Sequence, residues 1–228
     1  MDNNHIMYTT PTLEMMGASI TGHLGYSPQA TDVAVGDGAS IAYSETIGAG
    51  KEAGITIAYE GLKVGFYGAE RERTVPYTAA ATGNYQGDEF NGSWYAKYSM
   101  GPVAIGYSET YADAGVTSAI SATSTTTAKT RRSGGGIYTS ESMSIAFNVN
   151  DNMSISYTTA DETYDTQDNA KTAVTTDDDV TESIDAIQIA YSMGGMSIKA
   201  YNMEVTNPSQ DDDAADQSVT EIALGFAF

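Results

Sequence analysis

Two histidines are the only side chains of the sequence that titrate near neutral pH, and hydrolytic chemistry usually needs such a base. By the alternation described below, His5 and His23 fall on neighbouring segments and on the same, polar side. A catalytic histidine also needs a nucleophile within reach and an acid that orients it. No motif joins either histidine to such partners, and the absence of cysteine removes thiolate nucleophiles and thiolate metal sites. We therefore expect that the chain is not an enzyme, with a phospholipase or a protease as the enzymatic alternative.

Two runs of aspartate offer carboxylate oxygens, the ligands that calcium and magnesium prefer. The runs are Asp177, Asp178 and Asp179, and Asp211, Asp212 and Asp213. Neither run has the alternate-position spacing and the glycine of an EF-hand loop, so solvated loop charge is the favoured interpretation. We expect no cofactor apart from calcium or magnesium bound in these loops.

Alternating apolar residues and very short turns organise the rest of the chain. Ile55, Ile57 and Tyr59 alternate with small or polar residues, and after a turn at Gly61 the same pattern returns from Leu62. This is the period of two that is typical of a β-hairpin with one apolar face. Similar segments lie at 88–98, 103–107, 143–147, 153–157, 187–191, 196–198 and 222–228, with turns at 101–102, 150–152 and 194–195.

The N-terminal part adds a short strand that ends at Pro11 and a second strand between Met16 and Tyr26. About eleven strands result, given the boundary errors of such a prediction. The segment 40–46 is a candidate for a further short strand within its loop.

Short and long connections alternate along the chain, and the second face of the strands is small and polar rather than apolar. A soluble sandwich buries its apolar faces and has loops of broadly similar length at both ends. Periplasmic turns, long extracellular loops and a polar lumen instead fit an antiparallel up-and-down transmembrane β-barrel, an all-β fold. The long polar loops, of which 206–217 is one, are expected to be solvated coil. The formal charge of −20 disfavours nucleic acid as a partner and favours cations.

The last strand resembles the C-terminal assembly signal of outer-membrane β-barrels. Aromatic and aliphatic residues stand at alternate positions up to the final residue: Ile222, Leu224, Phe226 and Phe228. The resemblance implies recognition by the barrel assembly machinery and a location in the outer membrane of a Gram-negative bacterium.

The segment from His5 to Pro11, followed by 17–26, resembles the strand pair after the constriction loop in the sixteen-stranded general porins of proteobacteria. The resemblance covers nearly the whole chain but about two thirds of the family's barrel. It implies a single barrel domain over residues 1–228 that lacks the N-terminal strands and the constriction loop. The competing interpretation is a complete ten- or twelve-stranded barrel.

The porin resemblance implies a water-filled channel for passive diffusion of small hydrophilic solutes and ions. By the alternation, the pore-lining candidates are Lys63, Tyr67, Arg71, Glu89, Asn91, Tyr95, Lys97, Gln188 and Lys199. Outward aromatic residues, expected in girdles at the headgroup level, are Tyr59, Trp94, Tyr98, Tyr107, Tyr157, Tyr191, Phe226 and Phe228. Expected partners are outer-membrane lipid, lipopolysaccharide and further copies in a homotrimer. The alternative function is a non-conducting structural or adhesive barrel.

Overall fold

The computed structural model describes residues 5–28, 47–73, 88–113, 115, 137–165 and 179–226. All regular structure in these ranges is β-strand. The described part of the chain accordingly contains no helix that is long and apolar enough to cross a membrane. The predicted strand at 40–46 lies outside the described residues.

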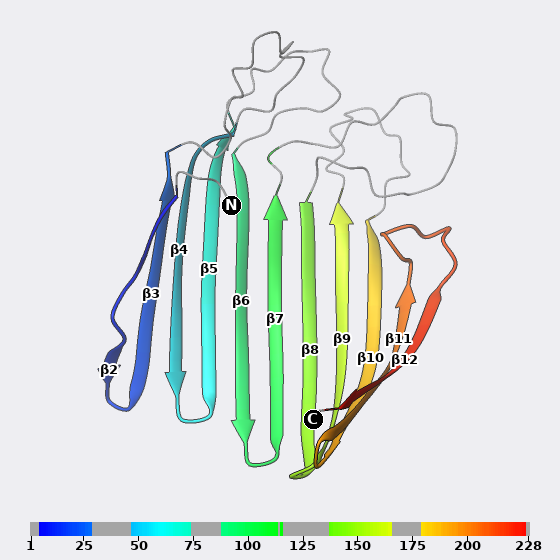
Figure 1. Cartoon of the computed structure of the whole chain (residues 1–228). Coiled ribbons are helices and arrows are strands. Elements are labelled where there is room, and N and C mark those ends of the chain that lie inside the picture. The colour runs from blue at the N-terminus through cyan, green and yellow to red at the C-terminus, as the bar shows by residue number, and fades with distance from the viewer. Residues whose placement is uncertain are drawn as a thin grey trace, which may run out of the picture.

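One antiparallel sheet holds every strand, and the strands follow one another in the order of the sequence (Figure 1). The strands are β1 (Ile6–Thr9), β2 (Leu13–Met15), β3 (Ala18–Ser27), β4 (Ile47–Tyr59), β5 (Leu62–Arg73), β6 (Glu89–Met100), β7 (Val103–Asp113), β8 (Ile137–Asn150), β9 (Met153–Asp165), β10 (Val180–Met193), β11 (Met196–Thr206) and β12 (Gln217–Phe226). This is the up-and-down arrangement predicted from the sequence.

A break at Pro11 explains why the described residues form twelve strands although the sequence predicted about eleven. The two short strands β1 and β2 both pair with β3, so they occupy one position at the edge of the sheet. Proline has no backbone N–H to give to the ladder, and an edge position tolerates that loss. Between the two pieces, Gly22 N donates a hydrogen bond of 2.8 Å to Thr10 Oγ1.

Backbone pairing divides the side chains of the sheet into two sets. Ile57 pairs with Val64, and the next residue, Ala58, pairs with Lys63. Residues opposite each other in a ladder share a face, and successive residues of a strand point to opposite faces. The register therefore defines an apolar face, which carries Ile57 and Val64, and a polar face, which carries Ala58 and Lys63.

Tight turns join the strands at one end of the sheet, at the positions that the sequence predicted. Gly101 and Gly194 have φ values of 55° and 58°, a left-handed conformation that residues other than glycine adopt only at a cost. Between β8 and β9, Asn152 N donates to Asn150 Oδ1 at 2.9 Å, a side-chain contact typical of turns. One further turn, at Met16 and Gly17, lies where the sequence predicted the start of a strand.

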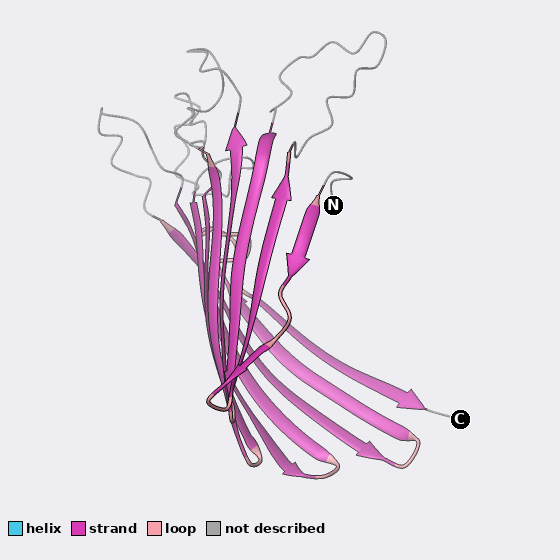
Figure 2. Ribbon diagram, turned by 90° about the vertical axis from the view of Figure 1, so that its left-hand side faces the viewer, coloured by secondary structure: helices cyan, strands magenta, loops and turns pink. Residues whose placement is uncertain are grey.

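The sheet is twisted and open rather than closed into a cylinder. Among the described residues, β1 and β12 are the two ends of the strand order, and neither pairs with the other. Seen from the side, the strands diverge towards the turn end, and the C-terminal strand lies far from the N-terminal one (Figure 2).

Because the chain has no cysteine, two introduced cysteines can test the register. Ser142 pairs with Ala160, whereas Thr158 pairs with Ser144, one step away on the same face. Opposite Cα atoms lie about 4.5–5.5 Å apart, within disulfide range, and diagonal ones about 7–8 Å apart. We expect that Ser142→Cys with Ala160→Cys forms a disulfide under mild oxidation, measured by mass spectrometry of alkylated thiols. The matched pair Ser142→Cys with Thr158→Cys should stay reduced, and preferential cross-linking of this second pair would contradict the register.

Candidate functional site

The polar face carries every residue that the sequence predicted to line a pore. The register places Lys63, Tyr67, Arg71, Glu89, Asn91, Tyr95, Lys97, Gln188 and Lys199 on this one face. Between them lie serine, threonine, glycine and alanine, and hydroxyls meet across strands, as where Ser108 and Ser142 hydrogen-bond at 2.8 Å. Small polar side chains leave open space that water can fill.

Basic residues of the polar face lie in separate places along the sheet. Lys63 and Lys97 are directly opposite each other near the short turns, while Arg71 is opposite Glu89 near the other end of its strand. Lys199 is opposite Ala190 and Ala223, several strands away from the other two lysines. The lysines near the short turns are therefore one pair with a third lysine apart from it.

Two tyrosine rings of the polar face lie against glycines of the neighbouring strand. A Cβ atom added to Gly54 would stand 2.3 Å from Tyr67 Cδ1, and one added to Gly65 would stand 2.4 Å from Tyr95 Cε1. The hydroxyl of Tyr67 is 2.7 Å from Thr56 Oγ1, which fixes the ring along the sheet. Glycine at these positions therefore lets large rings lie along the wall instead of standing into the space above it.

The apolar face exposes its large side chains, with Ile145, Ile187 and Ile222 exposed by 49%, 50% and 68%. Exposed apolar surface on this scale marks contact with lipid or protein rather than water. All seven described members of the predicted aromatic girdles lie on this face, since the eighth, Phe228, is outside the described residues.

Charged residues follow the apolar band on several strands. On β10 the band runs from Met193 to Ile187, roughly 20 Å along the strand at about 3.4 Å per residue, and the first charged residue after it is Asp185. That length is of the same order as the hydrophobic band of outer-membrane barrels, about 25 Å. On six strands the first charged residue beyond the band is a carboxylate, and together these form the acidic border: Glu70, Glu109, Glu141, Asp161, Asp185 and Glu204.

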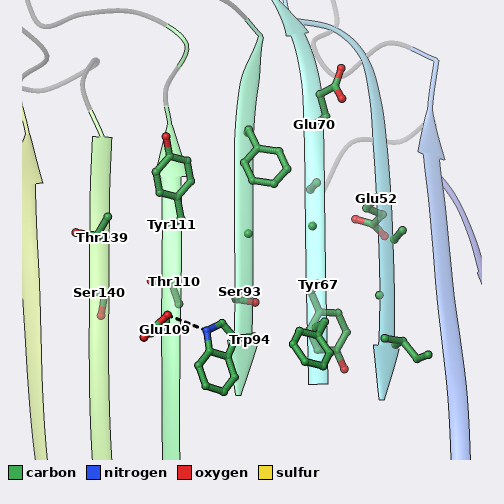
Figure 3. Close-up of a pocket in the computed structure, with 18 of the residues that line it drawn as sticks. Glu52, Tyr67, Glu70, Ser93, Trp94, Glu109, Thr110, Tyr111, Thr139 and Ser140 are labelled. Carbon is green, nitrogen blue, oxygen red and sulfur yellow. Dashed lines mark hydrogen bonds between the residues drawn. The ribbon is translucent and has the colours of Figure 1, made fainter. Parts of the chain in front are cut away.

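Aromatic side chains hydrogen-bond to the acidic border. Trp94 Nε1 donates to Glu109 Oε2 at 2.8 Å (Figure 3). The Tyr107 hydroxyl donates to Glu109 Oε1 at 2.5 Å. Likewise the Tyr157 hydroxyl donates to Asp185 Oδ1 at 2.6 Å. Rings with an apolar body and a polar tip suit the boundary between hydrocarbon and water.

Hollows lie on both faces of the described sheet. One of about 1400 Å³ takes most of its lining from the apolar face, and Trp94, Glu109 and Tyr111 are among the residues around it (Figure 3). Ala53, Gly68 and Gly92 also line it and form a row that has almost no side chain. Another, of about 490 Å³, is on the polar face beside His23, Tyr67 and Asn91. The larger hollow is therefore mainly a dip in the apolar surface, although Tyr67 also lines it, and the smaller one adjoins the predicted pore residues Tyr67 and Asn91.

The segment between β11 and β12 is not the solvated coil that the sequence predicted. Asn207 Nδ2 donates to the Thr181 carbonyl at 3.0 Å, and Gln210 Nε2 donates to Glu162 Oε1 at 2.6 Å. Gln210 is 2% exposed. We call this segment, 207–216, the inward loop, because it folds back over the polar face of β9 and β10. Sequence patterns missed it because its partners are distant in the chain.

The predicted metal ligands are only partly described. Asp177 and Asp178 lie outside the described residues, and Asp179 immediately precedes β10. The carboxylates of Asp211, Asp212 and Asp213, in the inward loop, have oxygens within 4.8 Å of one another. Asp213 N donates to Asp211 Oδ1 at 3.0 Å, so this cluster forms part of a turn.

The predicted assembly strand is β12. Ile222, Leu224 and Phe226 share the apolar face and are exposed, while Phe228 lies outside the described residues. The apolar band suits contact with lipid, aromatic residues lie at its limit, and the strands form an antiparallel meander. By these features the chain is an outer-membrane protein of the β-barrel type.

Substitutions at two adjacent residues of β10 can test which face of the sheet contacts lipid. Ile187 lies on the apolar face and Gln188 on the polar face. We expect that Ile187→Arg lowers the free energy of unfolding in lipid by up to about 2–4 kcal/mol, the cost of arginine near the bilayer midplane. The matched variant Gln188→Arg should change it by well under half as much. Urea titration in phospholipid vesicles measures both, and equal losses would argue against lipid on the apolar face.

Comparison with known proteins gives a weak structural likeness. No protein-family model matches the sequence, and no curated protein is significantly similar to it. A solved structure of OmpT with loop L8 deleted, an outer membrane protein of Vibrio cholerae, has 12% identity and a TM-score of 0.49. The trimer form of in-vitro folded OmpT from the same organism has 14% identity and a TM-score of 0.48. Each covers 97% of this chain, and the chain spans 62% and 63% of their lengths.

The prediction that the chain is not an enzyme was wrong. It depended on finding no acid beside either histidine, yet His5 Nε2 lies 3.3 Å from Glu52 Oε1 on the polar face. The solved structures that the chain resembles are of OmpT, an outer membrane protein. Two histidines without a flanking motif therefore do not exclude an enzymatic function.

Proposed function

We propose that the chain forms the wall of a porin channel, through which small hydrophilic solutes and ions diffuse across the outer membrane. The observation that supports this most directly is the placement of all nine predicted pore residues on one polar face. A lipid-facing sheet with small and polar side chains on its other face surrounds water when it closes.

Closure of the sheet is part of the proposal. Unpaired backbone groups at the edges β1 and β12 would cost several kcal/mol each in hydrocarbon, so both edges need partner strands. We propose that residues 1–228 belong to a single barrel domain of the general porin type, with further strands supplying the missing wall. Assembly as a homotrimer, contact with lipopolysaccharide, and recognition of Ile222, Leu224, Phe226 and Phe228 by the barrel assembly machinery are parts of the same proposal.

Single-channel conductance tests the proposal. The full chain, refolded in detergent and added to a planar bilayer, should give stepwise, long-lived openings. With a formal charge of −20, the channel should prefer cations, most strongly at low salt where screening is weakest. The reversal potential under a salt gradient measures this preference.

Other results of the same measurement would count against the proposal. Anion preference would contradict the charge argument. No conductance from protein that circular dichroism shows to be folded would favour the non-conducting structural or adhesive barrel.

The contacts between tyrosine rings and glycines of the polar face predict that replacing such a glycine narrows the channel. In Gly54→Val the new side chain would clash with the ring of Tyr67, which has to leave the wall and enter the water-filled space. We expect a lower single-channel conductance, and partial recovery in the double variant Gly54→Val with Tyr67→Ala. If the double variant conducts no better than the single one, the ring is not what narrows the channel.

A further inference from the structure

Two glutamates meet under the inward loop without a basic partner. Glu162 on β9 and Glu182 on β10 are directly opposite each other on the polar face. Like charges in this position destabilise a strand pair. In the described part of the chain no lysine or arginine is within ion-pair distance of either carboxylate. Something else must offset the repulsion where the loop covers the pair.

The inward loop contacts both carboxylates with consecutive residues. The backbone N–H of Ser209 donates to Glu182 Oε2, and Gln210 Nε2 donates to Glu162 Oε1 at 2.6 Å. The loop reaches this position with Asn207, Ser209 and Gln210 all at positive φ. Neutral donors of this kind hold the carboxylates in place but leave their two negative charges uncompensated.

A buried oxygen without a partner completes the group. Gln210 is 2% exposed, and its Oε1 has no hydrogen-bond partner. Leaving a buried acceptor unsatisfied costs free energy, and such atoms are rare in folded proteins. Because Oε1 and Nε2 belong to one amide, and Nε2 contacts Glu162, the unsatisfied oxygen lies next to the Glu162 carboxylate.

We propose that Glu162, Glu182 and Gln210 bind one calcium ion, which pins the inward loop to the polar face. Two carboxylates and an amide oxygen are hard ligands, and their joint charge matches a divalent cation. Calcium accepts six to eight oxygens in flexible geometry and leaves room for backbone carbonyls and water, whereas magnesium requires near-ideal octahedral geometry. The site differs from the aspartate run of the same loop, and it does not depend on whether the chain conducts.

Calcium titration of the full chain in detergent micelles, followed by calorimetry, tests the site. We expect one calcium ion per chain with a dissociation constant of about 10⁻⁵–10⁻³ M, and at least tenfold weaker binding of magnesium. Glu162→Gln, Glu182→Gln and Gln210→Ala should each weaken calcium binding about tenfold or more. Asp211→Asn with Asp213→Asn, in the same loop, and Glu141→Gln, a carboxylate opposite two others on the apolar face, should change it less than threefold.

A stability measurement separates loss of the ion from loss of folding. In EDTA, Glu162→Gln should raise the urea midpoint of unfolding because it removes like-charge repulsion. In millimolar calcium the order should reverse, with wild type more stable than the variant. No calcium binding by folded wild type, binding that depends on Asp211 and Asp213 instead of Glu162, or the same order of stability with and without calcium would each overturn the proposal.

Discussion

The register of the backbone ladder is the constraint on which the rest of the structure depends. Side chains alternate with a period of two, so a slip of one residue would exchange the two faces of a strand. At the junction of β8 and β9, such a slip would turn Tyr157 to the polar side and Thr158 to the lipid side. The separation of a lipid-facing surface from a water-facing one is therefore a property of the pairing between strands.

Little of the chain is stabilised by a core of its own. Apart from the small cluster beneath the inward loop, with Tyr164, Val180 and Val205 at 4–8% exposure, the described apolar side chains are not enclosed by protein. Lipid takes the place that a second layer of structure would have in a soluble domain. On the polar face, glycines opposite Tyr67 and Tyr95 let each ring lie close against the backbone, so that the rings do not project far from the sheet.

Sequence patterns predicted the strands and most turns because both signals are local. Alternation identifies a strand such as Met153–Asp165, and glycine or asparagine identifies the turns around it. The alternation of side chains along each strand was enough to place all nine pore candidates on one face. It could not show that Lys63 meets Lys97 while Lys199 stands apart, because that depends on which strands are neighbours. The inward loop and the pairing of His5 with Glu52 were missed for the same reason, since their partners lie far along the chain.

The acidic border also fixes how deeply the molecule can be immersed. Moving the sheet along its strands by one step of the alternation, about 7 Å, would carry Glu109, Glu141 and Asp161 into hydrocarbon, where ionised side chains are costly. Movement in the opposite direction would expose the apolar band to water. The border thus marks the boundary between hydrocarbon and water. Glu162, Glu182 and the inward loop lie on the aqueous side of this boundary, within reach of the ions of the surrounding medium.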